Sequence, residues 1–223
     1  MSLKKIPART DYVDAVYNSL LDAISAGKLA PGERITQEDL AERLNVSRSP
    51  VLQALRLLKK DGLLEEAPGR GLVVTRLDPV RIGQLYQVRG ALDALAARLA
   101  AQRQASIPLS LIERGRQAAA GSDVNALIDA DMAFHKAIYE ASGNPLIVET
   151  AAMHWLHLRR VMGAVLQRQV GRSSIWDEHA AILKAIREGD ADRAAALSEK
   201  HADLARVSLV AQLNAHEEML EVH

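Results

Sequence analysis

The sequence predicts a mainly α-helical protein with one small β-hairpin, divided into two domains near residue 77. Apolar residues recur at i, i+3, i+4 and i+7 over most of the 223 residues, which is typical of amphipathic helices. Between residues 63 and 75 this period is replaced by two short runs rich in Leu and Val, which are typical of strands. The stretch Leu77-Asp78-Pro79 then separates the hairpin from a long series of further helical segments.

The N-terminal part is expected to contain three helices, over residues 10–26, 36–45 and 47–61. Thr36 and Asp39 form a weak capping box at the start of the second helix. Ser47 caps the third, which tolerates Pro50 in its first turn because no hydrogen bond is lost there. Each helix has one apolar face, so the three are expected to pack together.

Two strand candidates follow, Leu63–Glu66 and Leu72–Thr75, joined by a loop that holds Arg70 between two glycines. Three helices followed by a hairpin describe a winged helix-turn-helix. Residues 1–76 are therefore predicted to be a DNA-binding domain, and residues 77–79 a linker. Residues 80–223 are predicted to form an all-α antiparallel bundle, with helices over 80–103, 108–119, 123–141, 145–169, 174–188 and 190–217.

Composition limits the partners and the location. Lys and Arg together number 28, as do Asp and Glu, so the net charge is zero and names no partner. The absence of cysteine excludes disulfides and thiolate metal sites. No apolar run approaches the roughly 20 residues of a membrane span, and the N-terminal segment lacks the apolar centre of a signal peptide. We expect a cytoplasmic protein without membrane association.

The third helix is expected to present a basic face to DNA. Arg can bridge the O6 and N7 atoms of guanine, and Ser and Gln can contact bases or phosphates. For one helix alone, a solvated basic face is the simpler interpretation. The tight turn before the helix and the hairpin after it favour DNA, since a lone Arg at a hairpin tip suits a narrow minor groove. The predicted DNA-binding residues are Ser47, Arg48, Ser49, Gln53, Arg56 and Arg70.

The stretch "GKLAPGERITQEDLAERLNVSRSPVLQALRLLKKDGLLEEAPGRGLVV" closely resembles the DNA-binding domain of GntR-family bacterial transcription regulators. The resemblance implies that Arg48, its neighbouring hydroxyl residues and the wing tip contact DNA. One position departs from the family pattern, because Leu52 stands where the family usually has a second Arg. Leu cannot hydrogen-bond to guanine but can pack on a thymine methyl group, so the family's sequence preference does not carry over.

A carboxylate and three imidazoles are predicted to point into the bundle. Asp131 and His135 lie four residues apart on the apolar face of one helix. His179 and His201 lie on the apolar faces of two further helices. A single such histidine is more often a hydrogen-bonded core residue, but burying all four groups without a common partner is costly. A divalent metal would be such a partner, and spacing alone leaves both interpretations open.

Residues 80–210 resemble the all-helical FCD effector domain found in one GntR subfamily. The matching stretches are "YQVRGALDALAARLAA", "DMAFHKAIYEASGNP" and "WDEHAAILKAIREGDADRAAALSEKH". The resemblance implies a divalent metal, with zinc expected first and nickel or manganese as alternatives, held by Asp131, His135, His179 and His201. It also implies a small carboxylate effector. Arg89, Arg159 and Arg160 are candidates to receive that carboxylate, although each could make an ordinary salt bridge instead.

The resulting hypothesis is a ligand-responsive repressor, without enzymatic activity, that binds a pseudo-palindromic operator as a homodimer and senses a small organic acid through a metal-containing pocket. The main alternative is a metal-dependent hydrolase with an appended helix-turn-helix domain. It lacks a general base, because Glu178, next to His179, is expected to point about 100° away from the metal. A purely structural metal without an effector is a third interpretation.

Overall fold

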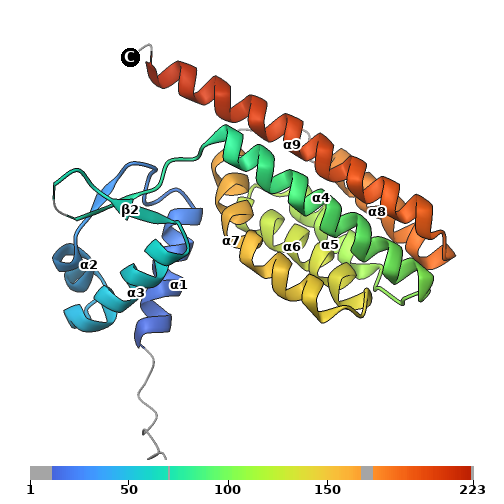
Figure 1. Cartoon of the computed structure of the whole chain (residues 1–223), viewed down its shortest axis with the longest axis horizontal. Helices are drawn as coiled ribbons and strands as arrows, with labels where there is room; N and C mark the ends of the chain where they lie inside the picture. Colours follow the sequence, from blue (N-terminus) through green and yellow to red (C-terminus); the bar gives the residue numbers. More distant parts are fainter. Residues whose placement is uncertain (1–11, 70, 167–172, 222–223) are drawn as a thin grey trace, which may run out of the picture. The chain divides into compact units, whose positions relative to one another are not determined.

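The chain divides into two compact units, Met1–Arg76 and Leu77–His223. The computed structural model describes residues 12–69, 71–166 and 173–221 (Figure 1). No helix among these residues is both long enough and apolar enough to cross a membrane. The predicted fold class is confirmed, with a winged helix-turn-helix first and a helical bundle second.

The N-terminal unit consists of three helices and a small antiparallel sheet. Its elements are α1 (Tyr12–Ser25), β1 (Arg34–Ile35), α2 (Gln37–Arg43), α3 (Arg48–Lys60), β2 (Leu64–Glu66) and β3 (Leu72–Val74). The strand order is β1-β3-β2, with Arg34 opposite Val73 and Leu64 opposite Val74. The sequence did not predict β1, because two residues are too short to show an alternating pattern.

Local chemistry explains where these helices begin and how they pack. Thr36 Oγ1 accepts a hydrogen bond from the backbone N–H of Asp39 at 3.3 Å, so the predicted cap of α2 is present. Ser47 occupies the N-cap position of α3, but its hydroxyl makes no capping hydrogen bond. The hydroxyl of Tyr17 donates to Asp61 Oδ2 at 2.7 Å, which ties α1 to the end of α3. The apolar face of α3 is buried: Val51, Ala54, Leu55 and Leu58.

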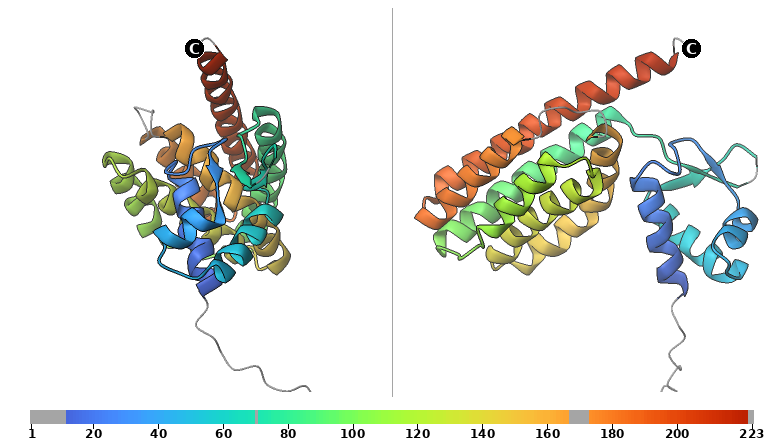
Figure 2. Two further views of the ribbon diagram at one scale, coloured as in Figure 1. Left: turned by 90° about the vertical axis from the view of Figure 1, so that its left-hand side faces the viewer. Right: turned by 180° about the vertical axis from the view of Figure 1, so that it is seen from behind.

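The C-terminal unit is a bundle of helices close to the predicted ranges. They are α4 (Pro79–Gln102), α5 (Ser110–Ala120), α6 (Val124–Ala141), α7 (Pro145–Leu166), α8 (Ser173–Glu188) and α9 (Ala191–Glu221). The predicted helix 145–169 ends in a stretch outside the described residues. The long helices α4 and α9 run antiparallel along each other and make the most extensive contact in the bundle (Figures 1 and 2).

Small residues allow the helices of the bundle to approach closely. A Cβ atom added to Gly90 of α4 would lie 3.3 Å from the Cβ of Ala202 on α9. A Cβ atom added to Gly115 of α5 would lie 2.0 Å from the ring of Trp176 on α8, so no larger residue fits there. Trp176 is buried, with 1% of its surface exposed. These contacts place α9 against α4 and α8 against α5.

The helix α6 turns its apolar face into this core, as the sequence predicts. Leu127, Ile128 and Ile138 are buried together with Asp131 and His135. The helix ends before Gly143, which adopts φ +66°, a conformation that favours glycine. Pro145 then begins α7. The core therefore presents one carboxylate and one imidazole from α6 to the facing helices.

Candidate metal centre

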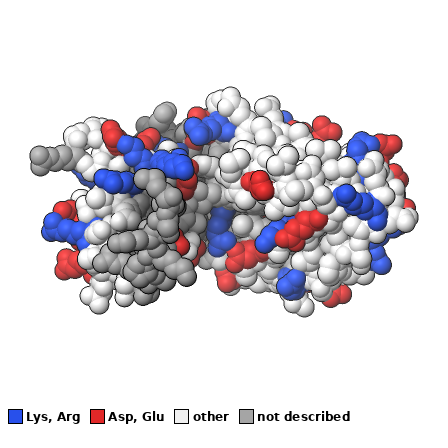
Figure 3. Space-filling view, turned by 60° about the horizontal axis from the view of Figure 1, so that its bottom comes forward, with Lys and Arg blue, Asp and Glu red and all other residues white. Residues whose placement is uncertain are grey.

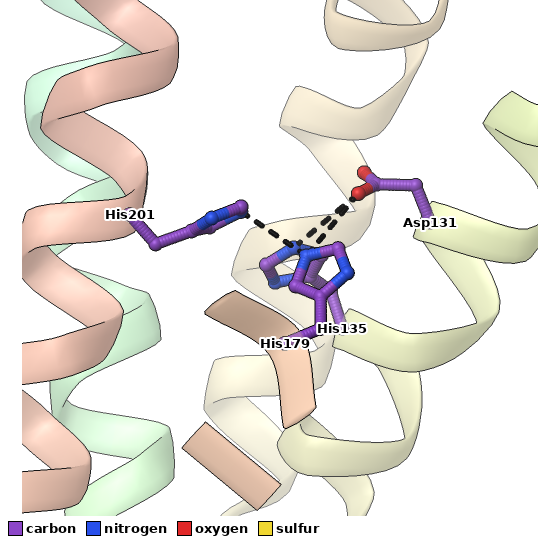
Figure 4. A group of neighbouring side chains, drawn as sticks. All are labelled: Asp131, His135, His179 and His201. Carbon is purple, nitrogen blue, oxygen red and sulfur yellow. Dashed lines mark hydrogen bonds and ion pairs between the residues drawn. The ribbon is translucent and has the colours of Figure 1, made fainter. Parts of the chain in front are cut away.

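The four predicted metal ligands come together in the core of the bundle (Figure 4). Asp131 and His135 project from α6, His179 from α8 and His201 from α9. All four are buried, and one potential ligand atom from each lies within 4.8 Å of the others. Four residues that lie up to 70 positions apart in the sequence, from Asp131 to His201, thus form a single cluster.

The three imidazoles face this cluster through the same ring nitrogen. His179 Nε2 lies 3.2 Å from His201 Nε2 and 3.4 Å from Asp131 Oδ1. His135 Nε2 lies 3.8 Å from the same oxygen and is a buried atom without a hydrogen-bond partner among the described residues. Metal–ligand bonds of about 2.0–2.2 Å place ligand atoms roughly 3–4.4 Å apart, so these separations fit one ion. The cluster is consistent with a metal site.

The opposite ring nitrogens of two of these histidines face carboxylates. His201 Nδ1 lies 2.7 Å from Glu178 Oε2, and His135 Nδ1 lies 3.5 Å from Asp93 Oδ2. His179 Nδ1 is buried without a hydrogen-bond partner in the described part of the chain. Metal-binding histidines commonly donate their other N–H to a carboxylate. Two of the three rings therefore have the surroundings expected of metal ligands.

Burial favours neutral imidazoles here. In the metal-free protein, burial lowers the pKa of His179 well below its ordinary value, and the neighbouring His201 and His135 lower it further. Burial also lowers the pKa of His135, with a contribution from Arg89. Burial alone would raise the pKa of Asp93, but His135 and Arg89 lower it to about 2. A neutral ring keeps a lone pair on one of its two nitrogens, and in the Nδ1–H tautomer that lone pair is on Nε2, where it can bind a cation.

Arg89 lies beside the cluster as a buried cation. Its Nε lies 3.3 Å from Asp93 and its Nη2 lies 3.7 Å from Asp131. The guanidinium also contacts the ring of Trp155 at 4.8 Å and the hydroxyl of Tyr86 at 3.4 Å. Burial alone would lower the pKa of Arg89, but the carboxylates raise it above its ordinary value, so the group stays charged.

The charges around the cluster also fit a divalent cation. Three carboxylates, those of Asp93, Asp131 and Glu178, surround the histidines, with Arg89 as the cation among them. An excess of two negative charges remains while the imidazoles are neutral, and one of these charges is on the partly exposed Glu178. Unbalanced charge is expensive to bury, and one divalent ion would neutralise it. The donor set of imidazole and carboxylate suits zinc, nickel or manganese and does not identify the ion.

The cluster opens on a cavity of about 380 Å³. Arg89, Asp131, Glu178 and His201 line it together with apolar side chains that include Trp176. Ser174 and Ser208 also line it. A cavity of this size can enclose a small molecule and offers it a guanidinium at one side.

The other two candidate effector arginines lie elsewhere. Arg159 forms an ion pair with Asp129 and is partly exposed. Arg160 is buried, with 4% of its surface exposed. Neither lines the cavity, whereas Arg89 does. The structure thus brings one of the three predicted arginines to the cluster.

Two residues at this centre were missed from the sequence. Glu178 was expected to point away from the metal, yet its carboxylate reaches His201 on α9, because α9 packs against α8 on that side. Asp93 was overlooked in the run Ala91-Leu92-Asp93-Ala94-Leu95. An acid within such an apolar helix is itself a signal, since aspartate is rarely buried without a partner.

The predicted DNA-binding residues of α3 lie on its exposed side. Arg48 has a side chain that is 68% exposed, and it lies 3.4 Å from Glu38 of α2. Leu52 is 38% exposed, so its side chain is available for contact at this surface. Arg70 lies outside the described residues. The remaining predicted residues are exposed as well: Ser47, Ser49, Gln53 and Arg56.

Charge is distributed differently over the two units (Figure 3). Basic side chains gather over part of the N-terminal unit, with acidic side chains among them. On the part of the C-terminal unit that this view shows, charges of both signs are scattered over a largely uncharged surface. A local concentration of Lys and Arg is what a phosphate backbone attracts, even in a protein with zero net charge.

Comparison with known proteins relates both units to described families. The family described as "Bacterial regulatory proteins, gntR family" matches residues 13–74, and "FCD domain" matches residues 84–204. A Streptomyces ambofaciens protein, named as an uncharacterized HTH-type transcriptional regulator in an unstable DNA locus, is 30% identical over 191 residues. That match covers 83% of this chain and 80% of the relative. The HTH-type transcriptional repressor NanR of Klebsiella aerogenes is 27% identical, and that match covers 90% of this chain and 86% of the relative.

Solved structures show the same fold. The structure described as McbR/YncC of E. coli has a TM-score of 0.76, with 23% sequence identity, over 90% of this chain and 98% of that one. At this identity the likeness concerns the fold alone. It extends over both the winged helix-turn-helix and the helical bundle.

Proposed function

Since the chain belongs to the GntR family of bacterial transcription regulators and carries an FCD domain, we propose that it is a repressor whose DNA binding responds to a small carboxylate. That carboxylate would be sensed at a metal centre formed by Asp131, His135, His179 and His201. The DNA-binding domain comprises residues 1–76 and the effector-binding domain residues 80–223. The GntR/FCD regulators are a non-enzymatic family, so the hydrolase alternative is set aside.

The exposed side of α3 supports the DNA-binding half of the proposal. Its arginines and polar residues lie on the surface that remains after Val51, Ala54 and Leu58 are buried. One such helix covers one half-site, so a two-fold homodimer would read a pseudo-palindrome with half-sites about 34 Å apart or less. Repression fits the relative named NanR, which is described as a repressor. Such a protein acts in the cytoplasm, where the chromosome lies.

The observation that carries the sensing half is the buried four-residue cluster at the wall of a cavity. A bound divalent metal would supply Lewis acidity that attracts a carboxylate oxygen. Arg89 lines the same cavity, and its guanidinium, which is ion-paired with Asp93 and Asp131, would also attract a carboxylate bound there. An effector changes DNA affinity only if it binds one arrangement of the dimer better than another.

Metal content and carboxylate titration test the sensing half directly. Protein purified without chelator should contain a divalent metal in stoichiometric amount, and His179→Ala should lose it. His154→Ala removes a half-exposed histidine of α7 outside the cluster and should keep the metal. Calorimetric titration with mono-, di- and tricarboxylates should show binding to metal-loaded protein that weakens in the apo protein and in Arg89→Ala.

Two results would reject parts of this function. Protein that neither retains nor takes up zinc, nickel or manganese would remove the metal centre. Full metal occupancy with no carboxylate binding would leave the metal a structural role and remove the effector. The DNA half is tested separately, by selection from random duplexes followed by gel shifts with and without the carboxylate.

A further inference from the structure

The contact between Glu178 and His201 joins two helices at the edge of the cluster. Glu178 Oε2 lies 2.7 Å from His201 Nδ1, the ring nitrogen that faces away from the other ligands. The side chain of His201 is 6% exposed and that of Glu178 is 38% exposed. The carboxylate therefore reaches from the cavity wall to a buried ring, and it does not enter the ligand set itself.

This contact determines which nitrogen of His201 carries the proton. An ionised carboxylate only accepts hydrogen bonds, so Nδ1 must donate and Nε2 keeps its lone pair. That lone pair is directed toward His179 Nε2, 3.2 Å away, where the cluster converges. A histidine in the other tautomer would present an N–H to the ion, and no bond to the metal could form until the proton moved.

The three histidines differ in how their rings are held. His135 faces Asp93, but that carboxylate also interacts with Arg89 and accepts a hydrogen bond from Tyr139. His179 Nδ1 has no partner among the described residues. Glu178 differs from Asp93 in this respect. Within the described residues, its carboxylate is hydrogen-bonded to the ring of His201 alone. Removing Glu178 should therefore disturb one ring and leave the buried ion pairs of the core intact.

We propose that Glu178 is a positioning residue that holds His201 as the Nδ1–H tautomer and thereby sets the affinity of the centre for a divalent metal. The inference rests on the metal centre proposed above. Carboxylates that orient a metal-binding histidine typically change metal affinity by about 10- to 100-fold. Glu178 adds negative charge beside the ion as well, so the tautomer and the charge have to be separated by experiment.

Three variants on α8 separate these effects. Glu178→Ala removes both the acceptor and the charge, and Glu178→Gln keeps an acceptor oxygen without the charge. Asp177→Ala is the matched control, because it removes the neighbouring negative charge, which pairs with Arg116 on α5 instead. Zinc affinity, measured by competition with a chromogenic chelator, should fall about 10- to 100-fold in Glu178→Ala. It should fall less in Glu178→Gln and stay within about twofold in Asp177→Ala.

A double-mutant cycle with His201→Ala tests whether Glu178 acts through this ring. Once His201 is absent, Glu178→Ala should lower zinc affinity much less, because only the direct effect of the carboxylate charge then remains. If Glu178→Ala lowered zinc affinity equally in the presence and absence of His201, the positioning role would be overturned. An unchanged affinity in Glu178→Ala itself would overturn it as well.

The tautomer can be read in the full-length apo protein, independently of metal and DNA. Long-range ¹H–¹⁵N spectra should show His201 protonated at Nδ1 in the unmodified protein and in Asp177→Ala. In Glu178→Ala they should show a mixture or the Nε2–H form. If the unmodified protein binds no metal but shows the Nδ1–H tautomer, the metal centre fails and the contact stands. An Nε2–H tautomer in the unmodified protein would overturn the inference even if metal binds.

Discussion

In the N-terminal unit the side chains proposed to act are exposed, whereas in the C-terminal unit they are buried. The side chain of Arg48 is 68% exposed and that of His179 is 0% exposed. An exposed arginine costs little to keep until DNA is present, so α3 folds by its apolar face alone. The buried groups must be compensated within the fold, because polar groups out of water are expensive. Changes in the two units should therefore have different consequences for folding.

The largest effect on stability is expected from Asp93. Asp93→Ala would leave Arg89 buried without its nearest carboxylate and would free the hydroxyl of Tyr139. Breaking a buried pair by removing one partner costs about 3–5 kcal/mol. The free energy of unfolding, measured by urea denaturation, should fall by about that amount.

Asp192→Ala is the control for Asp93, because it removes an aspartate that pairs with Arg98 on the surface of the same bundle. Exposed ion pairs contribute about 0–1 kcal/mol. If both variants had the same free energy of unfolding, the buried ion pair would contribute no more to stability than the exposed one. The proposed contrast between buried and exposed sites would then be wrong.

Metal removal should come next in size. The ligands come from α6, α8 and α9, so a metal that binds them stabilises the folded bundle. At a free metal concentration a hundred times the dissociation constant, the stabilisation is about 2.7 kcal/mol. A chelator should lower the melting temperature of the bundle, and zinc, nickel or manganese should restore it. In His179→Ala, neither the chelator nor the added metal should change the melting temperature. That result would show that the stabilising metal binds at this cluster.

The metal-free bundle should be sensitive to acid because of the same histidines. Burial lowers the pKa of His135 and His179 below the value of about 6.5 that they regain on unfolding. The unfolded chain then binds more protons, so the free energy of unfolding falls as pH decreases below about 6.5 and is flat above it. Each histidine contributes a slope of up to about 1.4 kcal/mol per pH unit.

Denaturation midpoints between pH 5 and 8 would measure that slope. His179→Ala should reduce it, whereas His154→Ala should not, since His154 lies outside the cluster. An identical slope in both variants would show that the buried ring of His179 does not titrate with unfolding.

The sequence predicted the elements of both units better than the contacts between them. The apolar periodicity of α3 predicted that one of its faces is buried. The four-residue spacing of Asp131 and His135 predicted that both lie on the buried face of α6. Periodicity placed His179 and His201 on inward faces of two further helices, and the family resemblance assigned them, with the two residues of α6, to one metal site. Glu178 was missed because its partner lies on another helix, and the direction of a side chain within one helix does not reveal what packs beside it.

On the exposed side, the effect of Arg48 should be confined to DNA binding. Arg48→Ala is expected to weaken binding to a selected duplex by about 1–3 kcal/mol, the usual contribution of a good base contact. Its melting temperature should stay unchanged, because the side chain is exposed. Arg98→Ala removes the same charge from the C-terminal unit and serves as the control. Fluorescence anisotropy would measure the affinity, and equal affinities in the two variants would remove Arg48 from the reading surface.

The smallest effect, and the one most specific to this chain, is expected at Leu52. It lies on α3 one turn after Arg48 and one turn before Arg56, so the three side chains share the exposed face. A leucine there gains from packing on a thymine methyl group, which contributes about 0.8 kcal/mol per buried carbon. Replacing thymine by uracil at each position of the selected duplex should weaken binding by about that amount at one position per half-site. In Leu52→Ala the uracil substitution should have no effect, since the contact is already absent. Leu52→Arg should retain binding and select different duplexes, with guanine favoured at that position. If all three proteins selected the same sequences and were equally indifferent to uracil, Leu52 would read no base, and its exposure would have another cause.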